Sequence, residues 1–233
     1  MAKFYGIGVG PGDSDLVTVK AVQCLANLDI LYTPESRKNG KSLALSIVGP
    51  HLSPQLCIKQ RHFPMISSFQ EKNNQWSAIA REIISDVKDG WNVGFVTLGD
   101  PMVYSTYSYL LERIGTDIET ETLSGIPSFI QLAATLQLPL TMDDQSLAVI
   151  PATASEDTLE QALLLHDTVV IMKVANHMDR VRSLLERLDL LETSHLVSKV
   201  AMEDQEIKSP LSSVHDLAGL SYFSTVLVTK RSH

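Results

Sequence analysis

The stretch YGIGVGPGD, residues 5–13, places four glycines and a proline directly after a short apolar run. A glycine-rich turn between a first strand and a first helix brings bare backbone to the carboxyl edge of an α/β sheet. Such a loop can hold a phosphate, or it can serve a ligand that needs close approach of the backbone. The pattern predicts that the chain opens with a strand, a glycine loop and a helix.

The loop does not match the common phosphate-binding motifs. When G-x-G-x-x-G is aligned from Gly6 or from Gly8, its last position holds Pro11 or Asp13 instead of glycine. A Walker A loop needs a lysine after its last glycine, where this chain has Asp13. Because an aspartate repels phosphate, two interpretations remain: a tight turn that needs glycine for its geometry, or close approach of the backbone to another kind of bound molecule.

Apolar periodicity predicts alternating strands and helices along the whole chain. The predicted strands cover residues 3–9, 29–33, 56–63, 91–98, 118–123, 147–150, 168–173, 195–200 and 223–230. The predicted helices cover residues 16–28, 42–48, 68–89, 124–136, 157–165 and 177–188. This order is typical of an α/β fold with a largely parallel sheet. We expect two α/β domains, residues 1–114 and 115–233, with a linker near residues 113–117.

Composition and charge narrow the function classes. The 233 residues carry a formal net charge of −8, which disfavours non-specific binding to nucleic acid. No apolar run approaches the roughly 20 residues that a membrane span needs, and the N-terminus leads into a strand pattern instead of a signal peptide. The cysteines and histidines show no metal-ligand spacing. We therefore expect a cytoplasmic protein without a metal site or membrane partner.

One segment departs from the acidic average. Residues 36–70 contain no Asp or Glu, although they include several cations: Arg37, Lys38, Lys41, Lys59 and Arg61. The segment could be a solvated basic face. It could also form a positively charged mouth for an acidic ligand, because a local patch can attract an anion even to an acidic protein.

Two further motifs follow predicted strands. LGDPMVYST, residues 98–106, joins a buried strand to an amphipathic helix, with Asp100 expected as the N-cap and Pro101 in the first turn. SGIPSF, residues 124–129, is a second strand-to-helix corner, which a simple turn would also explain. The first of these loops lies where open α/β sheets bind ligands, at the carboxyl end of a parallel strand.

In their order and spacing, the glycine loop, LGDPMVYST and SGIPSF resemble the tetrapyrrole (corrin/porphyrin) methylase family over nearly the whole chain. The chain is most similar to the C-20 methyltransferases of cobalamin biosynthesis, through the stretches RHFPM, LAVIPAT, VIMKV, AMEDQEI and YFSTVLV. The resemblance implies a homodimeric enzyme whose active-site cleft lies between its two domains. It also implies S-adenosylmethionine as the methyl donor, S-adenosylhomocysteine as the product, and precorrin-2 or cobalt-factor II as the tetrapyrrole substrate.

The resemblance also implies site residues, by their positions in the matching motifs. The cofactor contacts would be Pro11, Leu98, Gly99, Asp100, Val103, Ser128, Phe129, Met172, Ala201 and Thr225. The substrate's acetate and propionate groups suit Arg and Lys, and its flat ring suits bare backbone. We therefore expect substrate contacts at Gly8, Gly10, Gly12, Arg37, Lys38, Lys41, Lys59 and Arg61.

No catalytic residue can be assigned from the motifs. Some family members carry an Asp just after the second strand, where this chain has Pro34 followed by Glu35, so Glu35 is the one candidate for a base. Other functions remain as alternatives: a nucleotide-dependent oxidoreductase, a non-catalytic tetrapyrrole carrier, or a methylase acting at another ring carbon. The missing third glycine disfavours the oxidoreductase, and the loop LGDPMVYST, which has no use in a carrier, disfavours the carrier.

Overall fold

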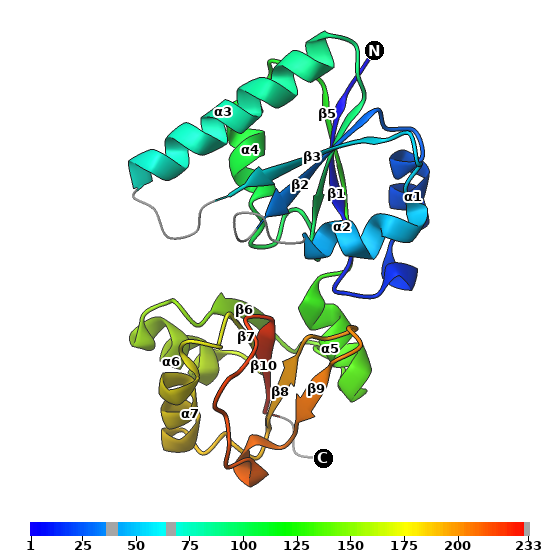
Figure 1. Cartoon of the computed structure of the whole chain (residues 1–233). Coiled ribbons are helices and arrows are strands. Elements are labelled where there is room, and N and C mark those ends of the chain that lie inside the picture. The colour runs from blue at the N-terminus through cyan, green and yellow to red at the C-terminus, as the bar shows by residue number, and fades with distance from the viewer. Residues whose placement is uncertain (36–41, 64–68, 231–233) are drawn as a thin grey trace. The chain divides into compact units, whose positions relative to one another are not determined.

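The computed structural model describes residues 1–35, 42–63 and 69–230. The chain forms two compact units, Met1–Pro127 and Ser128–His233, and each holds a five-stranded sheet within its described part (Figure 1). The predicted division into two α/β domains agrees with these units, but their border lies after residue 127 and not after residue 114. The reason is strand β5 (Thr120–Leu123), which pairs in parallel with β1 (Phe4–Gly8) and so belongs to the first unit.

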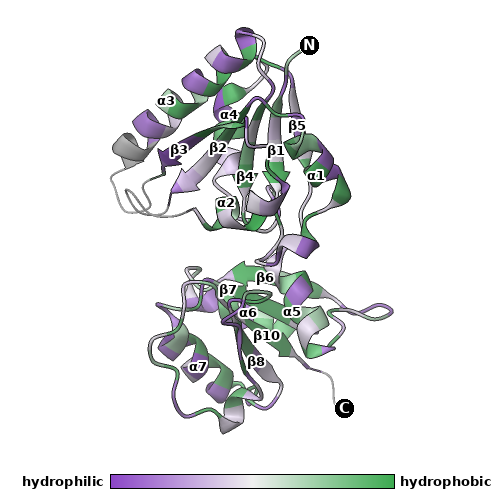
Figure 2. Cartoon of the chain, turned by 45° about the vertical axis from the view of Figure 1, so that its right-hand side comes forward, coloured by the Kyte–Doolittle hydropathy of each residue, from purple (hydrophilic) through white to green (hydrophobic). Residues whose placement is uncertain are grey.

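The first sheet is parallel throughout its described pairs, in the order β3-β2-β4-β1-β5. Its other strands are β2 (Ile30–Glu35), β3 (Cys57–His62) and β4 (Val93–Thr97). Every residue of β4 is buried, as expected of a strand covered on both faces. In Figure 2, the end of the edge strand β3 is purple, whereas β4 is green to white.

Helices cover both faces of the first sheet. Apolar residues of α1 (Val19–Leu25) and α2 (Leu43–Val48) share one core cluster with β1, β2 and β4. Residues of α3 (Phe69–Lys88) and α4 (Tyr107–Ile114) share a second cluster on the opposite face. The chain therefore leaves the adjacent strands β1 and β4 toward opposite faces, and open α/β sheets bind ligands at such a switch point.

The first helix is shorter than the periodicity predicts. A 3-10 turn (Ser14–Leu16) comes first, and α1 begins only after Thr18, whose hydroxyl oxygen accepts a hydrogen bond from the Ala21 N–H at 3.2 Å. A second 3-10 turn (Gly49–His51) follows α2, and a third (Leu211–Ser213) lies in the second unit.

The loop after β4 differs from its prediction. Helix α4 begins at Tyr107, so Asp100 is not its N-cap and Pro101 is not in its first turn. The helix cannot start earlier because Tyr104 has a φ of 49°, in the left-handed region that a right-handed helix excludes. Residues 98–106 instead form an irregular loop at the carboxyl end of β4.

Gly6 determines how α4 packs on the first sheet. A Cβ at Gly6 would lie 2.1 Å from the ring of Tyr107, which is fully buried. The Tyr107 hydroxyl lies 2.7 Å from the Thr122 hydroxyl on β5. The bare backbone of β1 therefore lets the first residue of α4 pack directly against the sheet, and this contact fixes where the preceding loop ends.

The second sheet is mixed, in the order β6-β7-β10-β8-β9. Its strands are β6 (Leu147–Pro151), β7 (Thr168–Met172), β8 (Ser194–Ser198), β9 (Glu206–Lys208) and β10 (Ser224–Thr229). The first pair is parallel and the other described pairs are antiparallel, so the prediction of a largely parallel sheet holds for the first unit. Helices α6 (Glu156–Leu165) and α7 (Met178–Arg187) pack on one face, and α5 (Ser128–Leu136) contacts β10.

Candidate functional site

Three glycines from the three sequence motifs meet at the carboxyl edge of the first sheet, and we call Gly8, Gly99 and Gly125 the glycine corner. A Cβ on Gly8 would lie 2.5 Å from the Gly125 nitrogen and 2.8 Å from the Gly99 oxygen. A Cβ on Gly125 would lie 2.2 Å from the Gly99 oxygen. The absent side chain of Gly8 therefore makes room for neighbouring backbone, and not for a macrocycle as the sequence analysis expected.

Backbone hydrogen bonds extend the ladder between β1 and β4 beyond the strands. The Val9 N–H donates to the Thr97 oxygen at 3.0 Å, and Gly10 and Gly99 exchange two bonds of 3.2 Å and 2.7 Å. Gly10 and Gly99 have φ angles of 76° and 70°, which favour glycine at both positions. The loops after β1 and β4 are thus fixed against each other, and the buried Pro11 follows directly.

Asp100 links the second motif to the third. One carboxylate oxygen accepts from the Met102 N–H at 2.8 Å, and the other accepts from the Gly125 N–H at 3.0 Å. Leu98, Gly99 and Asp100 therefore lie beside Gly125 within one unit. Because both carboxylate oxygens hold the backbone, Asp100 organises the loops that surround it.

Ser105 fixes the other end of the loop after β4. Its hydroxyl lies 2.9 Å from the Thr97 hydroxyl and accepts from the Tyr107 N–H at 3.1 Å, and Thr97, Ser105 and Tyr107 are all buried. Ser105 lies in LGDPMVYST but was not among the predicted site residues. Val103, a predicted cofactor contact, thus lies on a loop that is anchored at both ends.

The second unit brings three predicted cofactor contacts to one edge of its sheet. Met172 at the end of β7 is the direct register partner of Thr225 at the start of β10. Ala201 follows β8, whose last residue, Ser198, pairs with Ser224 of β10. Ala201 has a φ of 60°, and its N–H donates to the Gln205 side-chain oxygen at 2.8 Å.

Two more predicted contacts begin the second unit. Ser128 and Phe129 are the first residues of α5, and Phe129 is buried. Gly12, predicted as a substrate contact, is half-buried in the loop after β1. The predicted contacts Arg37, Lys38 and Lys41 lie outside the described residues.

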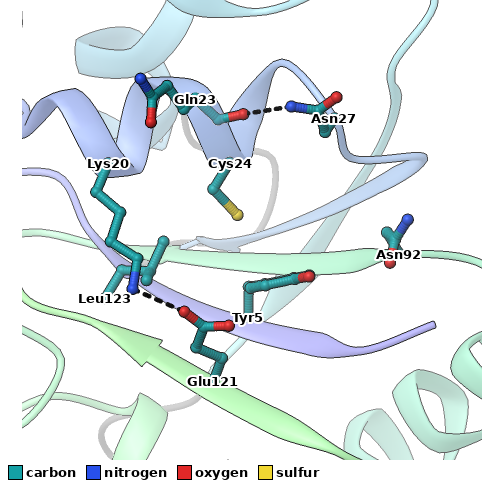
Figure 3. Close-up of a pocket in the computed structure, with 8 residues that line it drawn as sticks. All are labelled: Tyr5, Lys20, Gln23, Cys24, Asn27, Asn92, Glu121 and Leu123. Carbon is teal, nitrogen blue, oxygen red and sulfur yellow. Dashed lines mark hydrogen bonds and ion pairs between the residues drawn. The ribbon is translucent and has the colours of Figure 1, made fainter. Parts of the chain in front are cut away.

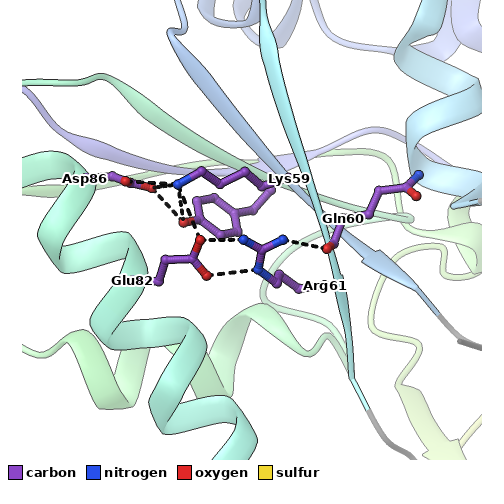
Figure 4. Close-up of polar contacts among 6 residues, drawn as sticks. Lys59, Gln60, Arg61, Glu82 and Asp86 are labelled. Atoms are coloured by element: carbon purple, nitrogen blue, oxygen red, sulfur yellow. Dashed lines mark hydrogen bonds and ion pairs between the residues drawn. The ribbon is translucent and has the colours of Figure 1, made fainter. Parts of the chain in front are cut away.

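The two described cations of the basic segment are paired with carboxylates of α3 (Figure 4). The Lys59 ammonium donates to Asp86 at 2.7 Å and lies 3.3 Å from Glu82. The Arg61 guanidinium forms two hydrogen bonds with Glu82, one of them at 2.9 Å. Residues 36–70 contain no Asp or Glu, but in the folded chain α3 provides the carboxylates that pair with Lys59 and Arg61.

Tyr32 completes this group, and we call Tyr32, Lys59, Arg61, Glu82 and Asp86 the ion-pair network. The Tyr32 hydroxyl donates to Asp86 at 2.6 Å. Burial, with the hydrogen bond to Asp86, raises the pKa of Tyr32, so its hydroxyl stays protonated. The hydrogen bonds from Arg61 hold the pKa of Glu82 below its ordinary value of 4.5. Lys59 and Arg61 therefore anchor the edge strand β3 to α3.

A hollow of about 260 Å³ lies between α1 and β5, apart from the predicted contacts (Figure 3). It is lined by Tyr5, Lys20, Gln23, Cys24, Asn27, Asn92, Glu121 and Leu123. Lys20 and Glu121 form an ion pair of 2.8 Å there. Burial raises the pKa of the Cys24 thiol to about 11, so the thiol stays protonated and is a poor nucleophile. The lining points to no reaction.

Within residues 1–35, 42–63 and 69–230, no group of His, Cys, Asp and Glu could hold a metal ion. The helices of these ranges include none that is both long enough and apolar enough to cross a membrane.

Solved structures of other proteins share the fold of this chain. A cobalt precorrin-4 methyltransferase matches with a TM-score of 0.77 and 20% identity, covering 97% of this chain and 94% of that one. A uroporphyrin-III C-methyltransferase from Thermus thermophilus, complexed with S-adenyl homocysteine, matches with a TM-score of 0.66 and 18% identity, covering 98% of each chain. The fold is the two-domain α/β fold found in these methyltransferases.

The sequence identifies the family within this class. The family model of the tetrapyrrole (corrin/porphyrin) methylases matches residues 3–214, and the chain belongs to this family. A cobalt-precorrin-2 C(20)-methyltransferase from Salmonella typhimurium is 43% identical over 229 residues, which cover 98% of this chain and 97% of that protein. The family predicted from three short motifs is therefore confirmed.

Proposed function

We propose that this protein is an S-adenosylmethionine-dependent methyltransferase that methylates C-20 of precorrin-2 or its cobalt-containing counterpart in cobalamin biosynthesis. The similarity to the Salmonella typhimurium C(20)-methyltransferase carries the proposal, because 43% identity extends over nearly the full length of both chains. The geometry of the strand-end loops supports it, since the motifs LGDPMVYST and SGIPSF meet at the glycine corner.

The chemistry of the predicted cofactor contacts fits the methyl donor. Among these ten residues only Asp100 is charged, and it is an anion, so no cation opposes a positively charged sulfonium. The others are small, apolar or hydroxyl-bearing side chains. When bound, S-adenosylmethionine supplies an electrophilic methyl group that a carbon nucleophile can displace in line.

The protein contributes mainly positioning in this proposal. Asp100 and Ser105 hold the loop after β4, and the paired Gly10 and Gly99 hold the loop after β1. Fixed loops can orient two reactants without a covalent intermediate. Glu35, the last residue of β2, remains the candidate for a base that removes the proton after methylation.

The substrate and partner assignments belong to the same proposal. Arg37, Lys38 and Lys41 are proposed to bind the carboxylates of the tetrapyrrole, because Lys59 and Arg61 already donate to α3 carboxylates. We propose a contact of Gly10 and Gly12 with the ring, a homodimer, a cleft between the two units, and a cytoplasmic location. Sedimentation of the purified chain at twice the monomer mass would support the dimer.

The test of the proposed reaction uses the methyl donor labelled with carbon-13 on its methyl group. The full chain is incubated with precorrin-2 and, separately, with its cobalt complex, and carbon NMR locates the label. We expect label at C-20. Label at another ring carbon would overturn the C-20 assignment and leave a tetrapyrrole methylase, whereas binding of NAD(H) without binding of S-adenosylhomocysteine would favour the oxidoreductase.

A further inference from the structure

Left-handed backbone occurs at several non-glycine residues, and some of these residues follow strands. Among the described residues the positions are Tyr104, Gln137, Asp143, Lys173, Asp189, Lys199 and Ala201. Gln137 and Asp189 follow helices, where this conformation is a common way to end a helix. Tyr104, Lys173 and Lys199 instead follow the strands β4, β7 and β8. Strained backbone persists where its surroundings fix it, and it clusters at ligand sites.

Tyr104 is the bulkiest of these residues, and its backbone is fixed from both sides. Asp100 ties the start of its loop to Gly125, and Ser105 ties the end to Thr97 and Tyr107. A left-handed conformation at an aromatic residue is an uncommon outlier. Residue 104 is not glycine, although the same loop has a glycine at residue 99, where φ is 70°. The side chain of Tyr104 is therefore retained despite the conformation.

Burial of the ring does not explain why a tyrosine is retained. Tyr104 is 47% exposed, and so is Tyr109 on α4. Tyr109 lies in a regular helix and its ring stacks on Trp76 with centroids 4.4 Å apart, a contact that stabilises the fold. Tyr104 lies in the loop that follows β4, next to the predicted cofactor contact Val103, and open α/β sheets bind ligands at loops of this switch point.

We propose that Tyr104 contacts the tetrapyrrole substrate, with its ring packed against the macrocycle and its hydroxyl donating to a substrate carboxylate. This inference rests on the proposed function. A flat conjugated ligand matches an aromatic face, and a phenol can donate to a carboxylate while it stays protonated. Partial burial raises the pKa of Tyr104 from its ordinary value of 10.0, which keeps the hydroxyl a donor at neutral pH.

The test compares four variants of the full chain: Tyr104→Gly, Tyr104→Asn, Tyr104→Phe and the control Tyr109→Leu. Gly and Asn both tolerate a left-handed backbone, so they remove the ring without adding strain. For each variant we would measure the KM for cobalt-precorrin-2, the Kd for S-adenosylhomocysteine by calorimetry, and the urea midpoint. The KM thus reports on contacts with the tetrapyrrole, and the Kd for S-adenosylhomocysteine reports on contacts in the cofactor site.

We expect Tyr104→Gly and Tyr104→Asn to raise the KM about tenfold, the effect of losing an aromatic contact and a hydrogen bond. Tyr104→Phe should raise it about threefold. The Kd for S-adenosylhomocysteine should stay within about twofold in all variants, and the urea midpoint reports whether each variant is folded. The Tyr109→Leu control should keep the wild-type KM.

Three results would overturn the inference: an unchanged KM in both the Gly and Asn variants, an equal loss of S-adenosylhomocysteine affinity, or the same rise in KM for Tyr109→Leu. These results leave the proposed function intact, since the wild-type chain would still bind and methylate. A wild-type chain that binds no S-adenosylhomocysteine would instead contradict the proposed function itself.

Discussion

The glycine corner and the ion-pair network each contain residues that were predicted to contact the substrate: Gly8 in the corner, and Lys59 and Arg61 in the network. In the corner, Gly8 was expected to leave space for a macrocycle, but backbone of Gly99 and Gly125 fills that space. In the network, Lys59 and Arg61 were expected to meet substrate carboxylates, but carboxylates of α3 meet them. In both regions, another part of the protein occupies the position that was predicted for the substrate: backbone in the corner, and α3 carboxylates in the network.

The two regions differ in what they do for the site. The corner lies at the carboxyl ends of β1, β4 and β5, where it joins three loops by direct backbone contact. The network lies between β3 and α3, where it ties an edge strand to a helix. Backbone contacts at van der Waals distance tolerate no added atom, whereas an ion pair can be replaced at moderate cost. The corner should therefore be far more sensitive to substitution.

The largest effect is expected for Gly8→Ala. Its Cβ would lie 2.5 Å from the Gly125 nitrogen, so the loops after β1 and β5 would have to separate. We expect a loss of about 4 kcal/mol or more in the free energy of unfolding, or no folded protein. Urea denaturation followed by tryptophan fluorescence measures it, because both tryptophans, Trp76 and Trp91, lie in the first unit.

Gly49→Ala is the matched control for this substitution. Nothing lies within 4 Å of a Cβ at Gly49, and its φ of −44° suits alanine. The control should change the free energy of unfolding by less than about 1 kcal/mol, with stabilisation the favoured direction. If Gly8→Ala were as mild as Gly49→Ala, the backbone contact in the corner would not be the reason for glycine at residue 8.

Much of the fold could be predicted from local sequence, because the periodicity of apolar residues and the glycines and prolines that end an element are local signals. The buried strand β4 and the helix α6 appear within a few residues of their predicted ranges. The three-residue strand β9 was not predicted, since an exposed edge strand has little apolar pattern. The domain border was placed too early because pairing of β5 with β1 depends on residues more than a hundred positions apart.

Site residues could be predicted where they belong to a short motif whose sequence indicates a strand-to-helix loop. Asp100 and Gly125 lie in two of the sequence motifs, and they are hydrogen-bonded to each other in the structure. The partners of Lys59 and Arg61 were missed because they lie on another element. One signal was present: Glu82 and Asp86 are four residues apart, on one face of α3, and the two cations are two apart, on one face of a strand.

A smaller effect is expected for Asp86→Ala in the network. The change removes the acceptor of the Tyr32 hydroxyl and the closest partner of Lys59, both of them largely buried. We expect a loss of about 2 kcal/mol in the free energy of unfolding of the first unit, because the Tyr32 hydroxyl loses this acceptor and Lys59 keeps only Glu82, at 3.3 Å, as a carboxylate partner. The control Asp89→Ala, at an exposed residue just after α3, should cost less than about 0.5 kcal/mol.

Urea midpoints from tryptophan fluorescence again measure both variants. Equal stabilities of Asp86→Ala and wild type would mean that the network holds β3 only weakly. Lys59 would then be available to a substrate carboxylate, as the sequence analysis expected. The same comparison therefore decides whether the network is structural or whether its cations serve the ligand.

The smallest expected effect is the pH dependence of Glu82. Its pKa is lowered in the folded chain, first by the hydrogen bond from Arg61, so folding favours the carboxylate. That stabilisation is complete above the ordinary pKa of 4.5 and is lost as the pH falls through the lowered value in the folded state. Glu82→Gln should therefore destabilise the first unit at pH 7, by less than about 1 kcal/mol, because the side chains of this pair are 34% and 33% exposed.

The difference between wild type and Glu82→Gln should shrink as the pH is lowered below 4.5, because wild type then loses the same charge. Urea denaturation of both chains from pH 7 to acid measures this difference. The control Glu119→Gln removes the exposed partner of Lys3 in the same unit, and it should leave the pH dependence close to that of wild type. A difference for Glu82→Gln that stays constant with pH would contradict the assignment of the ion pair, since a purely steric loss does not titrate.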